Sequence, residues 1–286
     1  MAKVGIATDT VQCLPPEIIK EFDIRMGSVN LVIDGKSYRD QVDVSNEQFF
    51  AWQKNLKEMP TTTGVNPADF ADIFRDLAKS TQDIICLPHS GGLGVTYDSA
   101  LQARDIVKEE MPGVNIEVID TKTAAGAQGL IVLEAARAAQ AGKSLSEIIA
   151  VIENMIPRVK WVSAVESLKY LIKGGRAPKY AGKMADLIGV KPIFGMMKGT
   201  GKVDYTGRVR TKPKSLTRLI QIAKENIQTG KPVHAVVHYT DSLEDGEKFR
   251  DMVASEFNCV ELYMTPWTPV MCCHSGPMIG LCFYSE

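Results

Sequence analysis

Short apolar runs alternate with amphipathic stretches through the first half of the chain, and this alternation strongly constrains the fold. Runs such as 3–9, 83–89 and 116–120 have the length and composition of buried strands. The stretches between them repeat apolar residues at helical spacing, and one begins with Ser144 and Glu147 at capping-box spacing. Strands that alternate with helices predict a largely parallel sheet covered on both faces. We expect this arrangement to end near residue 157.

The second half of the chain is organised differently. Strand-like runs follow one another more often there, which indicates a mixed α+β layer. The expected strands of this half are 160–166, 191–197, 233–240, 259–265 and 278–284. The sequence therefore predicts an α/β protein with two domains, residues 1–157 and 158–286. A crevice between two domains is a common place for a ligand.

The balance of charge narrows the classes of partner. Lys and Arg number 33 against 34 Asp and Glu, so no overall field favours nucleic acid or an anionic membrane. The first residues do not resemble a signal peptide, and no apolar run approaches the ~18 residues of a membrane span. We therefore expect a soluble, cytoplasmic protein that binds no nucleic acid and does not insert stably into a membrane.

The cysteines and histidines offer little for metal binding or catalysis. Six cysteines show neither a disulfide framework nor C-x-x-C spacing. Cys272, Cys273 and His274 stand together, but adjacent cysteines chelate a tetrahedral metal poorly and no second cluster supplies further ligands. Ser275 directly follows His274, which is the wrong relation for a nucleophile and its base, and no G-x-S-x-G elbow is present. We expect no metal and assign no catalytic residue.

Residues 59–70, "MPTTTGVNPADF", place three threonines before a helix start. Asn66 is expected to be the N-cap and Pro67 the first helical residue. The hydroxyls of Thr61–Thr63 would then lie at the positive end of a helix dipole. Hydroxyl donors there could pair with a carboxylate that leaves water, although the threonines could also simply build the turn.

Two glycine-rich segments and a histidine are further candidates for a binding site. Residues 87–97 form a strand-to-helix turn that could hold a phosphate, but they match neither dinucleotide nor P-loop motifs. In 173–179, Arg176 follows two glycines and could pair with a carboxylate or phosphate, or simply be exposed after a helix. Arg210 follows Arg208 on an expected strand, and His274 is expected in a turn near the C-terminus. A phosphate- or nucleotide-binding kinase or transferase therefore stays open.

Taken in order, these segments resemble the DegV family of bacterial lipid-binding proteins almost from end to end. The Pro-Thr-Thr motif at 60–62, the glycine-rich turn at 89–100 and the Gly-Gly-Arg at 174–176 carry much of the resemblance. Further segments that resemble the family are "ATDTVQCLPPEII", "VIDGKSYRDQVDVSNEQFF", "VIDTKTAAGAQG", "GVKPIF", "VRTKPKS" and "HSGPMIG". The resemblance implies a two-domain DegV-like fold, with a Rossmann-like parallel-sheet domain followed by an α/β domain with a mixed sheet.

The resemblance also implies a function. Members of the family hold one long-chain fatty acid between the domains, and several present it to a separate fatty acid kinase, which forms an acyl phosphate for phospholipid synthesis. On this resemblance the protein is not an enzyme and needs no cofactor. A regulatory lipid-binding protein without metabolic output is an alternative.

Carried over by position, the resemblance assigns ligand-binding roles to Thr61, Thr62, Arg176, Arg210 and His274. The chain departs from the family pattern in two places. Gly94 and Val95 replace a Ser-Gly pair, so a hydroxyl that contacts the carboxylate is missing, and Gly64 replaces a glutamine. Three groups could substitute for that hydroxyl: a backbone amide of Gly94 or Val95, or the side chain of Ser90. Thr63 is a further candidate.

Overall fold

A parallel sheet forms the first layer, as the alternating pattern predicts. The computed structural model describes residues 4–53, 56, 58–176, 189–196 and 199–286. The sheet has the strand order β2-β1-β6-β7, and its neighbouring strands are all parallel. The strands are β1 (Val4–Asp9), β2 (Arg25–Gly27), β6 (Asp83–Cys86) and β7 (Asn115–Val118).

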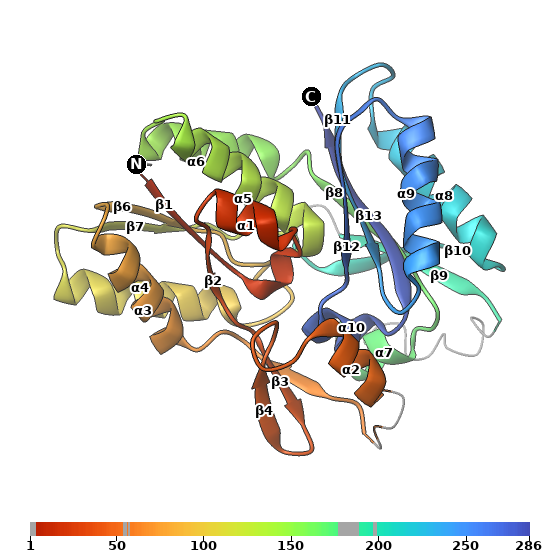
Figure 1. Ribbon diagram of the computed structural model, residues 1–286, viewed down its shortest axis with the longest axis horizontal. Coiled ribbons are helices and arrows are strands. Elements are labelled where there is room, and N and C mark those ends of the chain that lie inside the picture. Colours follow the sequence, from red (N-terminus) through yellow and green to blue (C-terminus); the bar gives the residue numbers. More distant parts are fainter. Residues whose placement is uncertain (1–3, 54–55, 57, 177–188, 197–198) are drawn as a thin grey trace.

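Helices cover both faces of this sheet (Figure 1). One face carries α3 (Pro67–Ala78) and α4 (Thr96–Glu110), and the other carries α5 (Ala125–Gln140) and α6 (Leu145–Met155). The predicted caps are confirmed: the Asn66 side chain accepts from the Ala68 N–H at 3.0 Å, and Ser144 with Glu147 forms a capping box. The shorter helices α1 (Pro16–Glu21) and α2 (Asn46–Gln53) also form.

The second half builds a six-stranded mixed sheet in the order β10-β9-β8-β13-β11-β12. Only the β11–β12 pair is parallel, so the expectation of a mixed sheet is confirmed. Helices α8 (Lys212–Asn226) and α9 (Leu243–Glu256) cover its outer face (Figure 1). The strands are β8 (Lys160–Val165), β9 (Lys191–Met196), β10 (Val203–Val209), β11 (Val233–Tyr239), β12 (Cys259–Pro266) and β13 (Met278–Ser285).

Helix α5 lies between the two sheets. It contacts β1 on one side and β8, β11 and β13 on the other, and 13 of its 16 residues are buried. Gly126 of α5 permits this close approach, because a Cβ there would lie 2.6 Å from Nε2 of His238 on β11. One apolar core therefore runs from the parallel sheet through α5 to residues of β8, β11 and β13. The domain boundary at residue 157 stays a prediction.

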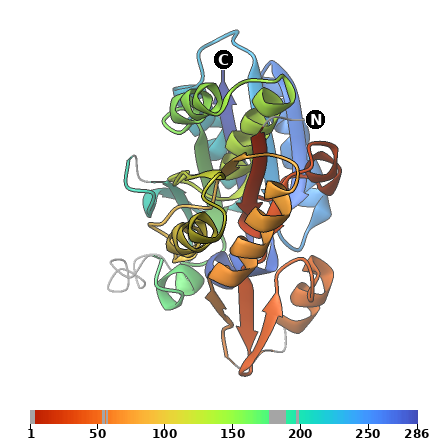
Figure 2. The same cartoon turned by 90° about the vertical axis from the view of Figure 1, so that its left-hand side faces the viewer.

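A third, three-stranded antiparallel sheet was not predicted. It has the order β4-β3-β5 and lies at one end of the molecule (Figures 1 and 2). Its strands are β3 (Asn30–Ile33), β4 (Lys36–Arg39) and β5 (Thr61–Thr63). The three threonines are thus an edge strand, with Thr62 opposite Leu31, and not only a lead-in to α3.

The placement of His274 in a turn was wrong. His274 lies in the last turn of helix α10 (Pro269–Ser275), which packs against the short helix α7 (Lys169–Lys173). Pro269 starts α10, and the turn begins one residue after the helix, at Gly276 with a φ of 63°. Among the described residues, we find no helix long and apolar enough to cross a membrane.

Candidate functional site

An apolar pocket lies at the carboxyl edge of the parallel sheet, where segments of both halves meet. The pocket and its open mouth together hold about 650 Å³ of empty space. Loops that follow β1 and β6 supply Val11, His89 and Leu93. The wall opposite comes from β8, β9, β10, α7 and α10, with Trp161, Phe194, Val203, Leu171 and Val270 among its residues.

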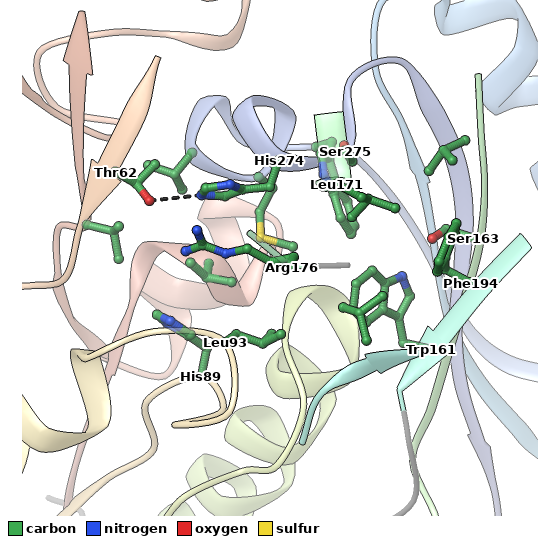
Figure 3. A pocket seen from close by; sticks show the side chains of 17 residues that line it. Thr62, His89, Leu93, Trp161, Ser163, Leu171, Arg176, Phe194, His274 and Ser275 are labelled. Atoms are coloured by element: carbon green, nitrogen blue, oxygen red, sulfur yellow. Dashed lines mark hydrogen bonds between the residues drawn. The ribbon is translucent and has the colours of Figure 1, made fainter. Parts of the chain in front are cut away.

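The side chains with ring or guanidinium nitrogens gather with Thr62 on one side of this pocket, whereas Ser163 lies beside Phe194 on the other. Figure 3 shows Thr62, His274, Arg176 and His89 together, whereas Trp161 and Phe194 lie on the opposite side. An apolar tail and an anionic head would therefore find different surroundings at the two sides. We call the side with Thr62, His274, Arg176 and His89 the polar end.

Thr62 and His274 form the hydrogen bond of the polar end. Thr62 Oγ1 lies 2.9 Å from His274 Nε2. Burial, together with the neighbouring Arg176 and His89, lowers the pKa of His274 to about 3, so the ring is neutral near pH 7. Nδ1 is buried against Gly174 without a partner in the described structure. Because a buried N–H rarely lacks an acceptor, we assign the proton to Nε2, which donates to Thr62 and leaves the Thr62 O–H free to donate into the pocket.

Arg176 supplies the positive charge of the polar end. It follows α7, and its Nη1 donates to the Gly174 carbonyl at 2.6 Å. Burial lowers the pKa of the guanidinium, which reflects the cost of holding a charge away from water. Within the described part of the chain, no carboxylate lies within 4.0 Å of it to form a salt bridge. An anion in the pocket would meet a positive charge that has no counter-ion among the residues the structure describes.

The structure brings together only some of the residues predicted for the site. Thr62, Arg176 and His274 line the pocket. Thr61 and Thr63 are exposed on the other face of β5, as the alternation of a strand requires, and Arg210 is exposed after β10. Neither Gly94 nor the 59%-exposed Val95 is among the lining residues. Ser90 is buried and donates to the Gly201 carbonyl at 2.8 Å.

His89 is a lining residue to which the sequence analysis gave no role. It follows strand β6 after Leu87 and Pro88 and precedes the glycine-rich turn, at the edge of a parallel sheet where ligands commonly bind. This position in the sequence was the one indication that His89 could contact a ligand. The partner of His89, Asp9, lies 80 residues away in the sequence, so the pair could not be recognised from spacing.

The residues that could bind a metal ion lie in two places in the structure. Cys272 and Cys273 are buried, and burial raises the pKa of both thiols, so neither is a ready thiolate. Among the described residues, Glu134, His234 and Glu261 could bring ligand atoms within 4.8 Å of one another. Arg137 already forms ion pairs with both carboxylates and supplies the positive charge that a cation would bring.

Fold and site together define an α/β protein of two main sheets, with an apolar pocket whose polar end suits an anion. The chain belongs to the DegV family: the family model described as "Uncharacterised protein, DegV family" matches residues 3–286. A DegV domain-containing protein of Caldanaerobacter subterraneus subsp. tengcongensis is 31% identical over 287 residues, which is 100% of both chains.

Solved structures of the family have the same fold. A stearic acid-binding protein of Eubacterium ventriosum superposes with a TM-score of 0.90 at 27% identity, covering 100% of this chain and 98% of that one. A DegV family protein of Thermus thermophilus described by its fatty acid binding has a TM-score of 0.89 at 25% identity, with 99% and 100% covered. DegV of Bacillus subtilis, described as a fatty acid binding protein, has a TM-score of 0.88 at 25% identity, with 100% of both chains covered.

Proposed function

We propose that this protein binds one long-chain fatty acid, with the carboxylate at the polar end and the tail along the apolar wall. The observation that carries the proposal is Arg176, a half-buried guanidinium without a carboxylate partner among the described residues, at one side of an otherwise largely apolar pocket. The Thr62 hydroxyl, oriented by His274, adds a hydrogen-bond donor. Solved relatives described as fatty acid binding support the choice of ligand.

The energetics suit a tightly held lipid. Burial of each methylene contributes ~0.8 kcal/mol, so a tail of about sixteen carbons contributes ~12 kcal/mol before the costs of binding. The carboxylate needs paired donors in this setting, because an uncompensated buried charge is costly. The pocket and its polar end would meet both requirements.

We further propose that the protein is a carrier that presents the bound acid to a separate fatty acid kinase for acyl phosphate formation and phospholipid synthesis. Its own side chains offer little for catalysis. The Ser275 hydroxyl donates to the Gly276 carbonyl at 2.8 Å, and the nearby thiols of Cys272 and Cys273 have raised pKa values. A group already committed in this way is a poor nucleophile.

The alternative of a phosphate- or nucleotide-binding enzyme has less support. The glycine-rich turn would have to offer free amides to a phosphate. The Gly91 N–H donates instead to the Asp120 carboxylate at 3.3 Å, and the Gly92 N–H donates to Ser90 Oγ at 3.1 Å. A carboxylate at the turn would also repel a phosphate.

Lipid extraction tests the binding proposal. Purified protein is denatured, extracted with solvent and analysed by mass spectrometry, and we expect about one fatty acid per chain. Recovery of no stoichiometric lipid, together with no binding of added palmitate, would refute it.

Incubation of the loaded protein with a fatty acid kinase and ATP tests the carrier role: acyl phosphate should form only when both proteins are present. Binding without any transfer would favour a regulatory lipid-binding protein.

A further inference from the structure

His89 is held in the pocket by a fully buried carboxylate. Asp9, at the end of β1, accepts from the His89 backbone N–H at 2.8 Å and lies 3.0 Å from His89 Nδ1. The same carboxylate accepts from the Val11 N–H at 2.9 Å. Because a carboxylate accepts hydrogen bonds, Nδ1 carries a proton and donates it to Asp9. The ring is therefore fixed in one orientation, with Nε2 at its free end.

That free end faces open space beside Gly94. Within the described structure, His89 Nε2 has no hydrogen-bond partner, although the His89 side chain is only 9% exposed. A Cβ built on Gly94 would lie 3.4 Å from Nε2, and apart from Gly94 and its two chain neighbours no other described heavy atom comes within 4 Å of that Cβ. A larger side chain at position 94 would occupy this space. Gly94 leaves it to the imidazole and to whatever the pocket binds.

Charge balance indicates the state of His89 when an anion is bound. Among the described residues, the charged groups of the polar end are Arg176 and the Asp9 that holds His89, since His274 is neutral near pH 7, and the ligand adds a further negative charge. With a neutral His89, two carboxylates would face one guanidinium in a largely buried site. A protonated His89 makes the set neutral, which a site of low polarity strongly favours.

We propose that His89, oriented by Asp9, is a head-group contact whose protonated Nε2 donates a hydrogen bond to the ligand carboxylate. The inference rests on the proposed fatty acid binding and adds a specificity-determining residue to it. Binding is non-covalent, and the one chemical change is the uptake of a proton by Nε2. A carboxylate gains a charge-assisted hydrogen bond there, whereas a methyl ester carries no charge to pair.

The test replaces His89 without leaving Asp9 unpaired. In His89→Asn the side-chain amide can still donate to Asp9, but no group reaches the place of Nε2. The double variant His89→Asn/Gly94→Ser returns a hydroxyl donor to the same space. His234→Asn, at a histidine paired with Glu261 outside the pocket, is the matched control. Displacement of a fluorescent fatty acid from delipidated protein measures the affinity for palmitate and for methyl palmitate, and thermal unfolding checks that each variant folds.

We expect His89→Asn to bind palmitate about 10- to 100-fold more weakly, the factor that corresponds to loss of a charge-assisted hydrogen bond. Its affinity for methyl palmitate should change by less than about threefold, a difference below ~0.7 kcal/mol. The added Gly94→Ser should recover most of the loss, and His234→Asn should match the parent. Parent-like binding of palmitate by His89→Asn, or equal weakening of acid and ester, would overturn the inference. If the parent itself binds no fatty acid, the proposed function fails instead.

Discussion

At the scale of single residues, strand β5 places Thr61 and Thr62 on opposite faces, although the resemblance assigned both to the ligand. Only Thr62 of the three reaches the pocket, where its hydroxyl meets His274, while Thr61 and Thr63 are exposed. We expect Thr62→Val to weaken fatty acid binding by ~1.5–3 kcal/mol, the range for a hydrogen bond to a charged group. Thr63→Val is the matched control on the same strand, and Thr61→Val should resemble it. Titration with palmitate measures all three, and equal affinities would show that the hydroxyl of Thr62 is structural.

Arg176 gives a prediction with opposite signs for stability and binding. In the empty protein its guanidinium is partly withdrawn from water without a carboxylate partner among the described residues. We expect Arg176→Leu to stabilise the lipid-free protein by ~0.5–2 kcal/mol, because it removes a partly buried charge that is kept at a cost to stability. The same change should weaken fatty acid binding. Chemical denaturation of delipidated protein and palmitate titration measure the two effects, and a loss of stability would contradict this account.

At the scale of elements, the two departures from the family pattern meet in space. Gly64 follows β5 and Val95 precedes α4, and a Cβ on Gly64 would lie 2.8 Å from Val95 Cγ2. The motifs on which the resemblance rests imply the opposite arrangement, with a glutamine at position 64 and a glycine at position 95. We therefore expect the residues at positions 64 and 95 to be coupled through packing between the end of β5 and the start of α4.

A double-mutant cycle tests this coupling. Gly64→Gln alone should destabilise the protein by ~1–3 kcal/mol, because a side chain is forced into filled space. Gly64→Gln/Val95→Gly should be more stable than the sum of the single changes by at least ~0.5 kcal/mol. Urea unfolding of the four proteins gives the coupling energy. Additive effects would mean that the strand and the helix adapt independently.

Helices and strands could be predicted where a short stretch of sequence carries a recognisable pattern. Helix caps such as Asn66 and the alternation of strands and helices are local, and both were confirmed. The sheet of β3, β4 and β5 was missed because its strands have only 3–4 residues each, too few to show a period. Helix α10 was missed because the Ser-Gly-Pro after His274 dominated that stretch.

The site was predictable only in part. Thr62, Arg176 and His274 were chosen because motifs carry them, and all three line the pocket, while their contact with a ligand stays a prediction. Thr61 and Arg210 were chosen by position in a motif, which does not tell to which face of a strand a side chain points. His89 depends on Asp9 from another strand, so only the folded chain reveals the pair.

At the scale of the whole molecule, His238 connects the two halves. Its Nε2 accepts from the Gly126 N–H of α5 at 2.9 Å, and its Nδ1 lies 3.3 Å from the Thr265 carbonyl of β12. Burial lowers the pKa of this histidine to about 4. A proton on Nε2 would break the bond to α5.

This arrangement predicts a loss of stability in acid. Because the unfolded histidine titrates near ~6.5 and the folded one near 4, unfolding takes up a proton in this window, so stability falls as pH falls from ~6.5 to 4. The slope contributed by His238 approaches ~1.4 kcal/mol per pH unit. Burial raises the pKa of Asp40 to about 7, so this group makes the folded protein more stable as pH falls. The pH dependence of the parent protein alone therefore does not isolate the effect of His238. His238→Gln, which keeps an acceptor for Gly126, should show a smaller acid loss in urea unfolding between pH 7 and 4; equal slopes would contradict the prediction.

The position of α5 bears on how the molecule can be divided. A gene that stops after residue 157 would produce the parallel sheet with its helices, but α5 would lose the strands β8, β11 and β13 that cover its second side. The buried residues of α5 are mostly alanine, leucine and other apolar residues, and an exposed apolar surface drives self-association in water. One half can therefore not simply be exchanged for that of a relative. A chimaera would have to keep the packing between α5 and strands β8, β11 and β13.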